Sequence, residues 1–221
     1  MILNMGHKIS DLIVAHRASA DVEAADLDHG EWERASAIHI TRYWSGEEAP
    51  DGRQAEARVL WSERALCVRF DCRQSEPLVV SSAPQRGEKS IGLWERDVCE
   101  IFVAPDARVP ERYFEFEAAP TGEWLDLAIH QMPLARETDW QYHSGMTAAA
   151  RIHEDRVIVA MRVPWEAFPR APQASARWRA NIFRCVGAAG PQRGYLAWQP
   201  TRTAQPNFHV PQAFGWLLFK G

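Results

Sequence analysis

The sequence has little positive charge and no long apolar segment. Its 25 lysines and arginines are outnumbered by 29 aspartates and glutamates, and the formal net charge is −4. Because nucleic acids are bound through clusters of basic side chains, we expect no nucleic-acid partner. Residues 1–8 show no charged segment followed by an apolar stretch, so we predict no signal peptide and no membrane contact. The compartment is unknown from these residues. With no signal peptide visible, we expect a cytoplasmic protein unless an export signal was removed.

Cysteine is scarce, and familiar catalytic motifs are missing. The four cysteines, at 67, 72, 99 and 185, form no CxxC pair and no other metal-binding spacing. Cys67 and Cys72 fall on one expected strand and point to opposite faces, so they cannot bridge each other. We expect free buried thiols, and a disulfide between two strands stays open. The sequence contains no P-loop, GxGxxG, HExxH, Ser-His-Asp or Cys-His nucleophile motif.

Long helical periodicity and internal repeats are absent as well. Short runs of β-forming residues recur instead, separated by Gly, Pro and polar clusters. This pattern is typical of a sandwich or barrel, and no linker divides it. We therefore predict one domain over residues 1–221, an all-β, antiparallel β-sandwich. The expected strands are a hairpin over 55–71 and the segments 97–104, 112–119, 123–130, 146–153, 156–163, 179–186, 195–198 and 216–219, with one helical turn at 164–168 and loops at 81–93 and 201–211.

Alternation along three expected strands predicts an acidic sheet face. Like charges on adjacent strands repel, so such a face calls for arginines, a cation or a polyhydroxyl ligand. The simpler interpretation is a solvated face with loosely paired arginines. The expected core residues are Cys99, Ile101, Val103, Phe114, Phe116, Leu125, Leu127 and Ile129, and the acidic face is expected to carry Glu100, Tyr113, Glu115, Glu117, Trp124 and Asp126, with Arg184 able to join it.

One segment carries a recognisable pattern, Trp94-x-x-Asp97-x-x-Glu100-Ile101-Phe102. Placed after the hairpin over 55–71, it resembles the carbohydrate-binding modules of family 9 and their DOMON-like relatives. The order and spacing of later segments extend the resemblance over about residues 20–221. These segments are Tyr113-Phe114-Glu115-Phe116, Pro120-Thr121-Gly122, Val163-Pro164-Trp165, Asn181-Ile182-Phe183-Arg184, Trp198-Gln199-Pro200, Phe208-His209-Val210-Pro211 and Phe214-Gly215.

The resemblance implies a DOMON-like, immunoglobulin-like sandwich that binds sugar. In characterised members two aromatic rings sandwich a terminal sugar and polar residues bind its hydroxyl groups. By position, Trp94 matches the first aromatic residue, and Phe208 stands where characterised binders have Trp. Glu100 matches an acidic sugar-contacting position, and Glu115 stands where a characterised binder has a basic residue. The full set of ligand-binding residues that we predict is Trp94, Phe208, Glu100, Glu115, Arg184 and His209, with no catalytic residue.

The function implied is non-catalytic recognition of a sugar or polysaccharide chain end, in carbohydrate catabolism and with a glycoside hydrolase as a candidate partner. Pyranose rings offer apolar C–H faces to aromatic side chains, and carboxylates accept strong hydrogen bonds from hydroxyl groups. We expect no required cofactor. Family members often carry calcium, whose ligands cannot be mapped from these residues.

Three alternatives stay open. Glu100, Glu115 and Glu117 could supply the two carboxylates of a glycoside hydrolase, although acids on an open sheet face are expected to stay solvated and to lack the raised pKa of a general acid. A DOMON-type haem module uses Met and His as iron ligands. A third alternative is an accessory domain that has lost its ligand. The residues available for haem are His130, Met132, His143 and Met146.

Overall fold

The computed structural model describes residues 11–221, so the expectation for residues 1–8 lies outside the described part. Within it, fourteen strands, one short α-helix and four 3₁₀ turns follow one another. No helix of the described part is long and apolar enough to cross a membrane. The elements are β1 (Leu12–Arg17), α1 (Glu31–Arg34), β2 (Ile38–Ile40), β3 (Arg42–Tyr43), η1 (Asp51–Arg53), β4 (Ala55–Trp61), β5 (Ala65–Arg73), η2 (Leu93–Glu95), β6 (Val98–Ala104), β7 (Arg112–Ala118), β8 (Trp124–Gln131), β9 (Arg136–Asp139), β10 (Thr147–Ile152), β11 (Arg156–Pro164), η3 (Trp165–Ala167), β12 (Arg177–Val186), β13 (Gly194–Ala197), η4 (Pro211–Ala213) and β14 (Gly215–Lys220).

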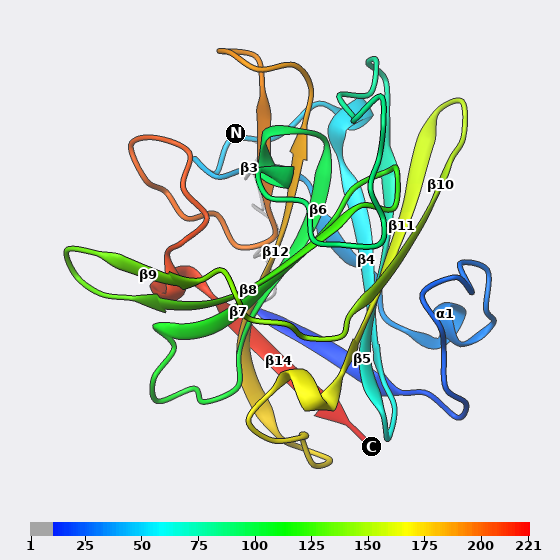
Figure 1. The fold of residues 1–221 in the computed structure, drawn as a ribbon, viewed down its shortest axis with the longest axis vertical. Helices are drawn as coiled ribbons and strands as arrows, with labels where there is room; N and C mark the ends of the chain where they lie inside the picture. The colour runs from blue at the N-terminus through cyan, green and yellow to red at the C-terminus, as the bar shows by residue number, and fades with distance from the viewer. Residues whose placement is uncertain (1–10) are drawn as a thin grey trace, which may run out of the picture.

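The strands form two layers that are joined through β1 and β14. The main path runs β10-β11-β5-β4-β1-β14-β12-β6-β7-β8-β9. In Figure 1, β10, β11, β5 and β4 lie on the right, and β12, β6, β7 and β8 lie on the left and centre. The predicted all-β sandwich is therefore confirmed. All pairs are antiparallel except those of β1, which runs parallel to both β14 and β4.

The main hydrophobic core lies between the two layers. It joins Phe70 of β5 and Val159 of β11 to Ile101 of β6, Phe116 of β7 and Phe219 of β14. Exclusion of this much aromatic and aliphatic surface from water is the main stabilising contribution. The residues predicted for the core in 97–104 and 112–119 are confirmed, except that Phe114 is only partly buried.

All four cysteines are buried and free, as expected. Cys72 of β5 and Cys99 of β6 meet across the core, with their sulfur atoms 3.4 Å apart. Cys67 points the other way from the same strand and packs in a separate cluster. Burial raises the pKa of the Cys67 thiol to about 12, so it stays protonated at neutral pH.

The assignment of faces along β8 was wrong. Leu127 pairs with Glu115 of β7, which places the leucines of β8 on the same face as the glutamates. Trp124 and Asp126 therefore point into the space between the layers, and Trp124 belongs to the main core. The buried Asp126 carboxylate is neutralised by Lys89, with Nζ and Oδ1 2.6 Å apart. Both faces of β8 are buried, so alternation along this strand could not distinguish them.

The strands predicted from residue 55 onward are confirmed within one or two residues, but β1 (Leu12–Arg17) and the shortest elements were missed. The shortest elements are β2, β3, β9 and helix α1, each of two to four residues. Such elements are too short to show a period, and pairing with a longer neighbour decides their conformation. Of these, β9 pairs with β8 and so extends the β7–β8 pair (Figure 1), and its residues line the cleft described next.

Candidate functional site

A cleft of about 560 Å³ lies on the glutamate-bearing face of β6, β7 and β8. Its other walls come from β9, from β12 and β13, and from the loop before η4. Five of the six predicted ligand-binding residues line this one cleft, although they are far apart in the sequence. They are Trp94, Glu100, Glu115, Phe208 and His209.

Two exposed tryptophans stand at the cleft. Trp94, in η2, is 36% exposed, and Trp140, directly after β9, is 43% exposed. Their ring centroids are 6.3 Å apart and their planes are inclined by 46°. Exposure of two large rings side by side is costly in water unless a ligand uses them. Sequence analysis missed Trp140, because only the pairing of β9 with β8 brings it beside Trp94.

The loop that carries Trp94 is held by Arg193. This buried guanidinium donates hydrogen bonds to the carbonyl oxygens of Trp94 and Arg96 at 2.8 and 2.6 Å, and to that of Gly187 at 2.7 Å. A loop fixed at several points presents its aromatic ring with little ordering cost on binding. Arg193 also lines the cleft and was not among the predicted residues.

Phe208 lies in the cleft wall rather than standing free. It is 8% exposed and stacks on Phe183 of β12, with centroids 4.1 Å apart and planes within 12° of parallel. Tyr195 of β13 meets it edge-on at 6.1 Å. One face of the Phe208 ring is therefore covered by protein, and the ring contributes to the stability of the fold as well as to the cleft.

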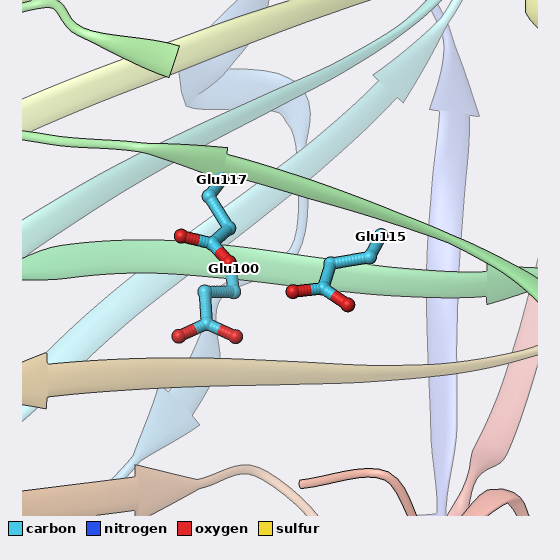
Figure 2. Close-up of side chains that lie close together, drawn as sticks. All are labelled: Glu100, Glu115 and Glu117. Atoms are coloured by element: carbon cyan, nitrogen blue, oxygen red, sulfur yellow. The ribbon is translucent and has the colours of Figure 1, made fainter. Parts of the chain in front are cut away.

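Three glutamates meet at the floor of the cleft (Figure 2). Glu100 of β6 is paired directly with Glu117 of β7. Glu115 precedes Glu117 by two residues on the same strand and therefore lies on the same face of the sheet. One carboxylate oxygen from each lies within 4.8 Å of those of the other two. All three side chains are buried, which corrects the expectation of solvated acids. Buried apolar residues of β8, β12 and the Phe208 loop form a hydrophobic cluster on this face of the sheet.

Burial sets the protonation of this cluster. Burial, and then the charge of Glu115, raises the pKa of Glu100 to about 8. Burial also raises the pKa of Glu117 well above its ordinary value, with smaller contributions from Glu100 and Glu115. Neither Glu117 oxygen receives a hydrogen bond, and Glu115 Oε2 receives none either. At neutral pH the apo cluster therefore retains protons that a solvated glutamate would have lost.

His209 closes one side of the floor. Its Nδ1 atom shares a 2.7 Å hydrogen bond with the Tyr113 hydroxyl and lies 3.9 Å from Glu115 Oε2. Burial lowers the pKa of His209 to about 3, so the ring is neutral and does not balance the glutamates.

Arg184 does not belong to the cleft, and the prediction that it lies beneath the site was wrong. It pairs with Cys99 and points between the two layers. Its guanidinium donates to the carbonyl oxygens of Arg53 and Arg73, both at 2.7 Å, and to Gln74 Oε1 at 2.6 Å. Alternation was predicted correctly along β6, but the register that aligns Arg184 with Cys99 rather than Glu100 is a property of the folded sheet.

Two of the residues considered for haem lie in different surroundings. Met146 is buried in the main core. His130 lines a second cavity, of about 720 Å³, on the other side of β7 and β8, and its Nδ1 lies 3.4 Å from Glu137 Oε2.

Comparisons with known proteins agree with this geometry. The family described as carbohydrate family 9 binding domain-like matches residues 25–221. No curated protein shows a significant sequence match to the chain. A structure described as a "putative carbohydrate-binding protein" from Bacteroides uniformis is 18% identical, with a TM-score of 0.70, and the alignment covers 95% of this chain and 99% of that one.

Two further similar structures are of a carbohydrate-binding module of family 9 from Caldicellulosiruptor kristjanssonii. The complex with cellotriose is 14% identical with a TM-score of 0.66, covering 95% of this chain and 94% of that one. The complex with glucose is 14% identical with a TM-score of 0.65, covering 95% and 96%. At these identities the structures establish a common fold, and the match over residues 25–221 establishes the family. The chain belongs to the carbohydrate family 9 binding domain-like family.

Proposed function

We propose that this chain binds a sugar, or the end of a polysaccharide chain, in the cleft between the tryptophans and the glutamate floor. The observation that carries the proposal is the exposed Trp94–Trp140 pair beside buried carboxylates. Solved members of the same fold are complexes with cellotriose and glucose.

The two surfaces of the cleft suit the two surfaces of a sugar. Tryptophan rings accept the apolar C–H face of a pyranose, and this contact buries aromatic surface that is otherwise exposed. Glu100 and Glu115 line the floor, where they accept hydrogen bonds from hydroxyl groups. Since the pKa of Glu100 is raised to about 8, its protonated form also donates a hydrogen bond at neutral pH.

The carboxylates are buried, yet their arrangement does not suit a glycoside hydrolase. In that reaction two carboxyl groups flank the scissile bond, at roughly 5 to 9 Å from each other. Here the three glutamates lie side by side on two neighbouring strands, with their carboxyl groups close to one another on one face of the sheet (Figure 2). The proposal is therefore a binding role in carbohydrate catabolism, in which the domain holds substrate for a partner glycoside hydrolase.

A binding experiment tests this function. We expect the purified chain to bind at least one member of a panel of mono- and oligosaccharides, titrated by calorimetry with reducing ends free and with reducing ends blocked. Trp94→Ala should strongly weaken that binding. An absence of binding to every sugar of the panel, or undiminished binding by Trp94→Ala, would rule out the proposed site. Hydrolysis of any oligosaccharide would instead support the alternative that the protein is a glycoside hydrolase.

A further inference from the structure

The glutamate floor has a property that sugar binding does not use. Glu100 and Glu115 line the cleft, but Glu117 lies beneath them, is 0% exposed and does not line it. Neither oxygen of Glu117 has a hydrogen-bond donor, and its carboxylate points toward the other two (Figure 2). A buried carboxyl group without a partner costs folding free energy, so its retention here requires a counterpart.

No basic side chain of residues 11–221 supplies that counterpart. None of the three glutamates forms an ion pair with a lysine or arginine of this range. Arg193 faces Glu100, but it donates to three backbone carbonyl groups instead. His209, 3.9 Å from Glu115, is kept neutral by burial. Cys185 Sγ, 3.4 Å from Glu100 Oε1, is a thiol whose pKa is raised by burial.

We propose that Glu100, Glu115 and Glu117 bind one divalent cation of the calcium type at the floor of the cleft. Calcium takes 6–8 oxygen ligands at about 2.3–2.6 Å, so oxygens on opposite sides of one ion are roughly 5 Å apart. The three carboxylate oxygens, all within 4.8 Å of one another, fit around such an ion. Carboxylates suit calcium, magnesium and manganese, whereas a protonated thiol offers nothing to a softer metal.

A carboxyl group ligates a cation in its deprotonated form, so binding of the ion releases any proton that the ligating group still carries. The charged or titratable groups facing the cluster, besides its own members, are Arg136, Arg193, Tyr113, Cys185 and His209, and of these only the arginines are cationic.

The ion would face the ligand. Glu100 and Glu115 line the cleft, so coordination positions that the three glutamates leave free open into it. Adjacent sugar hydroxyl groups are suitable oxygen ligands for these positions. This second step rests on the proposed function, and it is tested separately from cation binding.

The experiment is a calorimetric titration of calcium into the purified, EDTA-treated chain without sugar at pH 8, repeated with magnesium and manganese. The variants are Glu117→Gln and, as a matched control, Glu95→Gln, which removes an exposed carboxylate of the same cleft outside the cluster.

Wild type and the control should bind one ion per chain, release protons, and unfold at higher temperature with calcium. Glu117→Gln should lose at least tenfold in affinity while keeping the wild-type circular dichroism spectrum. If that variant misfolds, Glu115→Gln replaces it.

Absence of binding of all three cations, or equal affinities of Glu117→Gln and the control, would overturn the cation site. Sugar titrations with calcium and with EDTA then separate the two proposals. Sugar binding that survives in EDTA, in a chain that binds no calcium, would leave the proposed function standing without the ion. If the chain binds calcium but binds no sugar under either condition, the cation site is supported and the proposed sugar-binding function is rejected.

Discussion

The rings of Trp94 and Trp140 lie 6.3 Å apart by centroid and are inclined by 46°. Two parallel rings need roughly 7 to 8 Å between them to admit a sugar, since each stacking contact takes about 3.5 to 4 Å. The two tryptophans therefore form one continuous aromatic surface and cannot hold a sugar ring between them. The second face of a bound sugar is left to the wall that Phe208, Tyr195 and Asn207 provide.

Replacement of Trp94 by Ala should weaken sugar binding by about 2 kcal/mol or more, because a stacking ring is a typical hot spot. The melting temperature should change little, since the ring is exposed and outside the hydrophobic clusters. Trp140→Ala should weaken binding too. Calorimetry and thermal unfolding of both variants check this, and a Trp140→Ala variant with wild-type affinity would contradict a shared platform.

Replacement of Phe208 by Ala should act differently. The ring is buried against Phe183, so its removal leaves a cavity and should lower the free energy of unfolding by about 3 kcal/mol or more. Denaturant unfolding measures this loss beside that of Trp94→Ala. Equal stability of the two variants would mean that Phe208 does not pack as described.

Replacement of Glu117 by Gln should stabilise the chain in EDTA, by about 1–3 kcal/mol at pH 8, because it removes a buried carboxyl group without a partner. This gain in the free energy of unfolding depends on pH in a defined direction. A raised pKa means that the folded state binds more protons than the unfolded state above pH 4.5, so the glutamate favours folding less as the pH rises.

The advantage of Glu117→Gln over wild type should therefore grow from pH 5 to pH 8. His209 titrates with the opposite sign, since its lowered pKa costs stability as the pH falls below 6.5. Both proteins contain His209, so the difference between them isolates the glutamate. Unfolding curves at several pH values give this difference, and one that is constant with pH would show that Glu117 does not titrate differently in the folded state.

Replacement of Arg184 by Met should destabilise the fold without touching the cleft. It leaves the carbonyl groups of Arg53 and Arg73 without their donor, at a cost of about 2–4 kcal/mol. The matched control is Arg108→Met, whose exposed side chain pairs only with Asp106, and which should change little. Sugar affinity of the folded Arg184→Met chain should equal that of wild type. A selective loss of affinity would place Arg184 in the site after all.

By itself the sequence determined the sandwich, most strand positions and the residues of the cleft that lie on one recognisable pattern. Long alternating runs such as 97–104 have one well-defined buried face, so Cys99, Ile101 and Val103 could be assigned to the core and Glu100 to the opposite face. The order of the motifs that contain Trp94, Phe208 and His209 correctly predicted that these residues lie in one cleft.

Only the tertiary structure decided which strands are buried on both faces and what lies across from each residue. Local alternation says that Leu127 and Asp126 point in opposite directions, but not which of them shares a face with Glu115. Register likewise directed Arg184 into the core and brought Trp140 beside Trp94. Burial of Glu100, Glu115 and Glu117 depends on walls contributed by distant segments, and this burial, absent from any local pattern, sets the chemistry of the floor.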